Sequence, residues 1–168
     1  CVLSLVHQKS QSRILISTST PNSYIYSIAQ KYEIPVIVNK GNSGLAEDWN
    51  FAYNCAKTPL VTLAHQDDRY YENYAADILE VAGKCKHPLI IFSDYNEARG
   101  GKTVTKNQLL KIKRLMLMPL KIQKLWKSRF VRRRILSIGS AICCPAVTLV
   151  KDNLPGFCFK NNMKSNID

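Results

Sequence analysis

Two adjacent aspartates, Asp67 and Asp68, follow the apolar run 60–64, which predicts a short buried strand. Ligands of open α/β sheets bind outside the carboxyl ends of the strands. Adjacent carboxylates repel each other unless a cation is bound, and Mg²⁺ and Mn²⁺ prefer oxygen ligands and bridge to substrate phosphates. The pair therefore predicts metal-assisted chemistry on a phosphorylated substrate. A turn that caps the following helix explains the same dipeptide equally well.

The elements that would position this pair alternate along the chain. Short apolar segments predict strands at 13–17, 34–39, 60–64 and 88–92, and helical patterns cover 24–31, 45–57 and 72–82. Such alternation is typical of βαβ units. It predicts an α/β protein with a mostly parallel, Rossmann-like sheet flanked by helices.

The composition is that of an ordinary globular domain. The chain has 168 residues, 46% of them hydrophobic, and its mean hydropathy is -0.15. It begins with Cys1 and ends at Asp168 inside a polar segment, so we expect a fragment of a longer protein. Its six cysteines include no C-x-x-C pair. This favours reduced thiols in a cytoplasmic protein over a zinc site.

The positive charge is concentrated in one segment. The chain has a net charge of +12, and residues 102–134 hold twelve of its 24 basic residues. The helical pattern in this segment is interrupted at Pro119, and an apolar, strand-like stretch follows at 142–150. No acidic residue occurs between Glu97 and Asp152. The rest of the chain is neutral, so the segment requires its own explanation.

Three interpretations of the basic segment remain open. It is a solvated pair of amphipathic helices, or a surface for anionic lipids with Trp126 and Phe130 at the interface, or a nucleic-acid patch. No recognisable nucleic-acid-binding motif supports the third interpretation. In the first, the apolar positions expected in the core are Leu109, Leu110, Ile112, Leu115, Met116 and Leu120.

A longer pattern surrounds the acidic pair. The stretch 39–53 contains an N-x-G turn, Asn42 to Gly44, followed by a helical pattern, one further strand and then the two aspartates. In this the chain resembles family 2 glycosyltransferases of the GT-A fold, where such a turn leads into a helix and the next strand ends in a D-x-D-type motif. The segment 142–150 resembles the acceptor-side strand of that family. The resemblance covers most of the chain and is weak over 102–134.

The resemblance implies roles for three aspartates. Asp68 would hold Mg²⁺ or Mn²⁺ on the diphosphate of a sugar nucleotide, and Asp67 would contact the ribose or support the metal. Asp168 falls where the family places the general base that deprotonates the acceptor hydroxyl, with inversion at the anomeric carbon. A loop or helix-cap role explains Asp168 equally well.

The same resemblance places four residues of 42–50 near the nucleotide. Asn42 and Gly44 precede a helix N-terminus suited to anionic ligands, although an ordinary turn explains them too. Asp48 and Asn50 would face the nucleotide from that helix, since Asn is a mediocre helix former, and a solvated face is the alternative.

The chain also departs from the family pattern. Where the family carries an Asp after its second strand, this chain has Ser17 and Thr18 in a run of hydroxyl residues, which can still bind a base or ribose. The family's first strand is absent, consistent with a missing N-terminus. His65 would contact a phosphate or satisfy a strand-end carbonyl. Asp94 would line the acceptor cleft or form a turn.

These observations predict transfer of a sugar from a nucleotide-diphosphate sugar to a glycan or lipid-linked acceptor, for cell-surface polysaccharide or glycolipid synthesis. The chain would be one partial catalytic domain, with 1–101 binding the donor and 102–168 forming the basic, acceptor-side half, and we expect the fragment to be inactive. A membrane-linked acceptor would place the protein at the inner face of the membrane. The alternatives are a nucleotidyltransferase and a non-enzymatic module that binds anionic lipid or nucleic acid.

Overall fold

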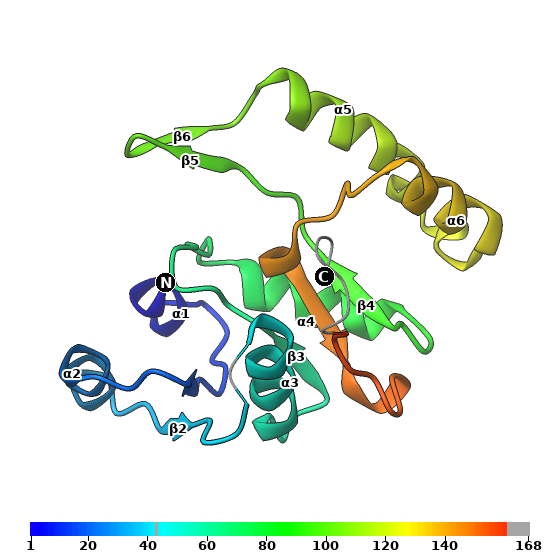
Figure 1. Ribbon diagram of the computed structural model, residues 1–168. Coiled ribbons are helices and arrows are strands. Elements are labelled where there is room, and N and C mark those ends of the chain that lie inside the picture. Colours follow the sequence, from blue (N-terminus) through cyan, green and yellow to red (C-terminus); the bar gives the residue numbers. More distant parts are fainter. Residues whose placement is uncertain (43, 161–168) are drawn as a thin grey trace. The chain divides into compact units, whose positions relative to one another are not determined.

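The computed structural model describes residues 1–42 and 44–160 and contains two compact units (Figure 1). The first unit comprises Cys1–Ile91 and the described residues 147–160, and the second comprises Phe92–Ala146. The chain thus leaves the first unit once and returns to it. The functional halves predicted at 1–101 and 102–168 are a separate division and stay a prediction.

The first unit alternates helices and strands, as the sequence predicts. In chain order its elements are α1 (Val2–Val6), β1 (Ile16–Thr18), α2 (Ser23–Lys31), β2 (Val36–Val38), α3 (Leu45–Cys55), β3 (Leu60–Thr62), α4 (Tyr74–Lys84), β4 (Ile90–Phe92), β7 (Val147–Val150) and the 3₁₀ turn η4 (Lys151–Asn153). The mixed α/β class is therefore confirmed. The strands are shorter than predicted because the flanking apolar residues lie outside the hydrogen-bonded ladders.

β1 and β2 form a parallel pair connected through α2. Ile16 is opposite Val36 and Thr18 is opposite Val38. α2 starts at a regular cap, in which the side chain of Asn22 accepts a hydrogen bond from the backbone N–H of Ile25. This is the βαβ unit that the alternating pattern predicts, and it directs the carboxyl ends of both strands to the same edge.

The other strands of the first unit do not extend this pair into one parallel sheet. β3, β7 and β4 form a separate sheet in that order, and β7 runs antiparallel to β3. The predicted single, mostly parallel sheet is therefore not found in the described ranges. The physical reason is that β7, from much later in the chain, lies between β3 and β4 and prevents them from pairing directly.

Helices cover both faces of the three-stranded sheet. Successive residues of a strand point to opposite faces of the sheet. Leu149 and Val150 of β7 therefore contribute to the core on opposite sides of the sheet. Leu149 packs with Tyr53 of α3, while Val150 packs with Ile78 of α4. The sheet is thus buried between α3 and α4, which agrees with the predicted helical flanks.

The second unit consists of a hairpin followed by helical segments. Its elements are β5 (Glu97–Arg99), β6 (Lys102–Val104), α5 (Gln108–Leu117), the 3₁₀ turns η1 (Met118–Lys121) and η2 (Gln123–Lys127), α6 (Arg129–Ile138) and η3 (Cys144–Ala146). The hairpin was not predicted from the sequence. Gly100 and Gly101 form its turn with φ of 54° and 76°, values that favour glycine.

Arg114 organises the start of the second unit. Its guanidinium binds the carboxylate of Asp94 at 2.9 Å and donates to the backbone oxygens of Thr105 and Tyr95 at 2.6 and 2.9 Å. A fourth bond reaches the side-chain oxygen of Asn96 at 3.0 Å. One basic residue of the segment is therefore structural, since it fastens α5 to the strands before it.

The predicted apolar face of α5 is only partly buried. Leu110 is fully buried, but Leu109, Ile112 and Leu115 are 51%, 49% and 65% exposed. Placing all these positions in the core was wrong, because several of these apolar side chains of α5 are exposed to solvent. Among the described helices, none combines the length and apolar character needed to cross a bilayer.

Candidate functional site

A carboxylate of α3 joins the ends of the two parallel strands. The Asp48 side chain accepts hydrogen bonds from Ser19 Oγ at 2.9 Å and from Asn39 Nδ2 at 2.8 Å. Ser19 directly follows β1, and Asn39 directly follows β2. These bonds bring polar residues together at the carboxyl edge of the strand pair, and Asp48 faces that edge rather than solvent. Charge-assisted bonds of this kind are stronger than neutral ones.

Asn39 is the centre of this cluster and is absent from the predicted site residues. Its side chain is buried, and its Oδ1 accepts from the backbone N–H of Gly41 at 3.0 Å. The backbone N–H of Asn39 donates to the carbonyl of Thr18 at 2.8 Å. The available signal was its position, since it is the first polar residue after an apolar strand. The predicted residues Ser17 and Thr18 lie in β1, and Thr18 Oγ1 accepts from the Thr20 N–H.

The turn before α3 lacks a side-chain cap. Gly44 is the N-cap residue, and its carbonyl accepts from the Asp48 N–H at 2.8 Å. Asn42 is exposed, and its carbonyl lies 3.4 Å from Asn39 Nδ2. Glu47 and Asp48 occupy the first helical turn, so negative side chains already compensate the positive end of the helix dipole. This weakens the attraction for a phosphate at this terminus.

The acidic pair lies in a turn beyond β3. The backbone N–H of Asp68 donates to the carbonyl of His65 at 3.2 Å, and β3 ends at Thr62. The N-cap of α4 is Asn73, so neither aspartate caps that helix. The alternative that the pair caps the following helix is therefore wrong, and the metal role stays a prediction.

The electrostatics of the turn are unfavourable for two charges. Asp67 is exposed and Asp68 is 38% exposed. Partial burial, and then the neighbouring Asp67, raise the pKa of Asp68 above its ordinary value, while His65 opposes this rise. His65 Nδ1 lies 3.8 Å from Asp68 Oδ2, which is beyond a strong hydrogen bond. A cation bound here would relieve the repulsion.

An aromatic stack connects this turn to α3. The rings of Trp49 and His65 lie 5.0 Å apart at an interplanar angle of 23°, and the Phe159 ring meets Trp49 edge-on at 5.1 Å. Within the described ranges, His65 Nε2 is buried without a hydrogen-bond partner. Trp49 therefore holds His65 in place and with it the acidic turn. Neighbouring residues of α3 thus reach the strand-end cluster and the acidic turn.

Two predicted site residues have structural partners instead. The amide of Asn50 donates to the carbonyl of Phe159 at 2.8 Å and accepts from its N–H at 2.7 Å. These two hydrogen bonds attach the C-terminal segment to α3. They use the side-chain amide of Asn50 that was expected to face a nucleotide. Asp94 belongs to the second unit, where it binds Arg114. Asp168 lies outside the described residues.

The donor set suits a metal that shares its ligands with a substrate. Within the described ranges, no three His, Cys, Asp or Glu side chains come together as a metal cage. Magnesium needs no such cage, since it is commonly bound by one or two carboxylates together with substrate phosphates. Asp67 and Asp68 in one exposed turn fit that arrangement.

An α/β unit with polar groups at its strand ends and an acidic turn is typical of transferases that bind nucleotides. The family model described as glycosyl transferase family 2 matches residues 1–153, and the chain belongs to this family. The resemblance stated from the sequence is thereby confirmed. Such a family implies a nucleotide-sugar donor and a glycan acceptor in general. Neither a curated protein nor a solved structure gives a significant match.

Proposed function

We propose that the chain carries the donor-binding part of a metal-assisted, inverting glycosyltransferase. The observation that carries the proposal is the arrangement on α3. Asp48 reaches the ends of β1 and β2, and the next residue, Trp49, stacks on the histidine of the acidic turn. One helix therefore positions two polar clusters of different character.

The strand-end cluster suits the uncharged part of a nucleotide. Asp48 is held by two donors, and with Glu47 it makes the start of α3 negative. A diphosphate is repelled by these charges, whereas a base or ribose can donate hydrogen bonds to a carboxylate and to the hydroxyls of Ser17 and Thr18. We therefore assign the nucleoside to this cluster, with Asn42 and Gly44 at its border.

The acidic turn suits the diphosphate together with its cation. Asp68 is the ligand, Asp67 is the second carboxylate, and His65 contributes a buried Nε2 that lacks a partner within the described residues. A bound Mg²⁺ or Mn²⁺ would neutralise the charge of the departing nucleoside diphosphate. The protein orients this turn through the stack of Trp49 on His65, and the acidic side chains remain accessible.

The acceptor side of the reaction is a proposal from sequence alone. Asp168 as general base would take the proton of the acceptor hydroxyl, which then attacks the anomeric carbon in line with the leaving diphosphate. The attacking oxygen gains the glycosidic bond as the bond to the diphosphate breaks, and the configuration inverts. A carboxylate suits this role because it is ionised near neutral pH.

The test uses the full-length protein with nucleoside-diphosphate sugars and Mn²⁺ or Mg²⁺. We expect metal-dependent transfer or donor hydrolysis that falls by about 100-fold or more in Asp68→Ala, since metal charge stabilisation contributes several kcal/mol. Asp77→Ala on α4 is the matched control, because Asp77 is exposed and belongs to neither cluster. Equal activity of the two variants would show that the acidic turn holds no catalytic metal.

The nucleoside assignment needs a second variant. Asp48→Asn should raise the KM for the donor more than it lowers kcat, because the nucleoside contributes binding in both ground and transition states. A fall in kcat with unchanged KM would place Asp48 at the reacting centre and contradict the assignment.

A further inference from the structure

The second unit carries nearly all of the charge excess. It contains thirteen of the 24 basic residues and two of the 12 acidic residues. Both of these acidic side chains are already engaged, Asp94 with Arg114 at 2.9 Å and Glu97 with Arg99 at 2.7 Å. The remaining positive charge of the unit is therefore not neutralised from within.

The uncompensated charges gather from η1 to the end of α6. None of the basic side chains there forms an ion pair within the described part of the chain. They are Lys121, Lys124, Lys127, Arg129, Arg132, Arg133 and Arg134. This differs from α5, where Arg114 is structural and Lys113 donates to the Tyr95 hydroxyl at 2.8 Å.

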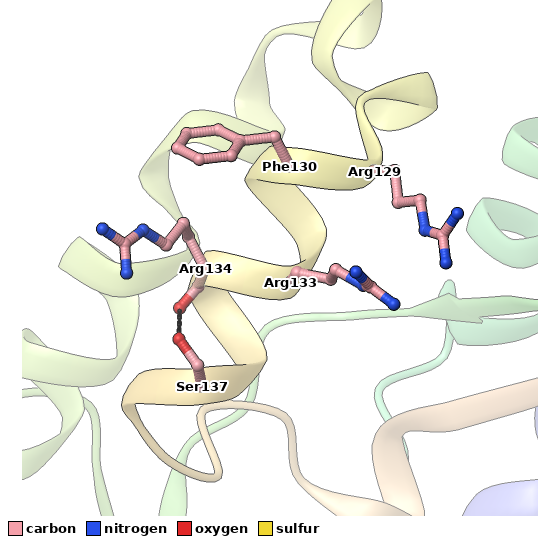
Figure 2. A pocket seen from close by; sticks show the side chains of 5 residues that line it. All are labelled: Arg129, Phe130, Arg133, Arg134 and Ser137. Carbon is pink, nitrogen blue, oxygen red and sulfur yellow. Dashed lines mark hydrogen bonds between the residues drawn. The ribbon is translucent and has the colours of Figure 1, made fainter.

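Three of these arginines surround a hollow on α6. Arg129, Phe130, Arg133, Arg134 and Ser137 line a volume of about 480 Å³, and Figure 2 shows the arginine side chains extending from the helix on both sides. Arg134 lies over the Phe130 ring at 5.7 Å, and its carbonyl accepts from Ser137 Oγ at 2.9 Å. The guanidinium fork binds phosphate oxygens in pairs, so the lining suits phosphate groups.

Large apolar side chains lie among these cations. On α6, Phe130 is 72%, Ile138 is 70% and Leu136 is 63% exposed. The helix keeps Ile135 buried, so its core contact is separate from this surface. Exposed apolar groups beside a dense positive field are unusual for a free surface and indicate a partner with both apolar and anionic parts.

We propose that α6 docks on an anionic membrane surface, with its arginines on lipid phosphates and Phe130 in the interfacial region. An amphipathic helix with a basic polar face and aromatic side chains binds bilayers in this way. A second copy of the chain is disfavoured because it brings the same positive charge. A nucleic acid would satisfy the arginines but would leave the apolar side chains in water. The proposal is independent of the glycosyl transfer proposed above.

The experiment measures binding of the full-length protein to vesicles of phosphatidylcholine with and without phosphatidylglycerol. We expect binding only to the anionic vesicles and a strong decrease with salt. The combined change Arg129→Gln, Arg133→Gln and Arg134→Gln should weaken it on the order of 100-fold, because each basic residue near such a surface contributes about fivefold. Glutamine preserves the helix, and circular dichroism checks the fold of each variant.

The matched control removes three charges elsewhere. Lys86, Lys102 and Lys106 are exposed and lie outside α6, and their change to glutamine should weaken binding by less than fivefold. An equal loss in both triple variants would show that net charge alone attracts the protein and would overturn docking by α6. The single change Phe130→Ser should weaken vesicle binding about tenfold, since it removes an apolar contact without altering charge.

Three further results would overturn the proposal. One is equal binding to neutral and anionic vesicles. Another is tighter binding of single-stranded RNA than of anionic vesicles, lost in the triple arginine variant, which would make nucleic acid the partner. The third is a dimer, detected by light scattering, that Phe130→Ser converts to a monomer. This would show that a second copy of the chain binds the exposed face of α6.

Discussion

Replacing Asp68 by asparagine should stabilise the free protein and remove its binding of metal and nucleotide. Asparagine has the shape of aspartate without the charge. In the folded chain Asp68 is partly buried beside Asp67, and these two causes raise its pKa. A carboxylate placed for structure would behave in the opposite way, since its loss would destabilise the fold.

The stability that the free protein gains from Asp68→Asn depends on how far the Asp68 side chain is exposed to solvent. The Asp68 side chain is 38% exposed, so solvent screens much of the repulsion from Asp67. An exposed charge pair changes the free energy of unfolding by about 0.5 kcal/mol. Here the two charges repel each other, so removing one of them should raise the free energy of unfolding. For a chain of this size that corresponds to a rise of about 1–2 °C in Tm.

The stabilisation by bound ligand, which Asp68→Asn should lose, is larger than this gain. A ligand that binds only the native state at 100 times its Kd stabilises it by about 2.7 kcal/mol, or roughly 5–10 °C. Nucleoside diphosphate with Mn²⁺ should produce this shift in the wild-type protein and almost none in Asp68→Asn. Differential scanning fluorimetry of the full-length protein, with and without the ligands, measures both effects.

The pH dependence has a definite sign. Because the folded-state pKa of Asp68 is raised, its protonated form contributes stability below the ordinary carboxyl pKa, and this contribution is lost as the pH rises through the raised value. Metal competes with that proton, so the ligand-induced shift in the wild-type protein should grow across the same window. In Asp68→Asn neither change should occur.

Two outcomes would refute this reasoning. A lower Tm of free Asp68→Asn would show that the carboxylate stabilises the turn, contrary to its raised pKa. An unchanged ligand shift would show that the metal site lies elsewhere. Asp77→Asn provides the control, since that exposed carboxylate on α4 should leave the ligand shift unaltered.

Three further predictions concern the structural polar groups. Asp48→Asn should lower the free energy of unfolding by about 1–3 kcal/mol in chemical denaturation, because one of its two donors loses its acceptor and the other keeps only an uncharged one; an unchanged value would mean that the strand-end cluster is not maintained in solution. Asn50→Ala should speed hydrogen exchange at the Phe159 amide, while Asn54→Ala, an exposed change on the same helix, should not. Arg114→Ala should destabilise the second unit by about 2–3 kcal/mol, measured by denaturation, and a change below 0.5 kcal/mol would contradict its organising role.

Local patterns determined several elements without the structure. The periodicity of 45–57 predicted α3 within two residues, and the apolar segments predicted β3 and β4. The signal for the hairpin of β5 and β6 was also present, since Gly100 and Gly101 are a strong turn pair. The strand pattern around this turn is weak, because both strands are only three residues long and flanked by polar side chains.

Long-range pairing was beyond local patterns. β7 follows β3 by more than 80 residues, and nothing in either segment specifies that they pair, or that β7 separates β3 from β4. The partners of the polar residues were equally hidden. Asn50 and Asp48 are two positions apart on α3, yet one binds the backbone of Phe159 and the other binds the ends of two strands.

The sequence by itself determined the family, the acidic pair and the location of the positive charge, because these depend on residue types at short spacing. Only the tertiary structure decided that Asp67 and Asp68 cap no helix, that Trp49 holds the acidic turn through His65, and that α6 exposes its arginines beside Phe130. Each of these depends on which side chains meet across elements distant in sequence. Such contacts are set by the packing of the whole core and not by the local preferences of any one segment.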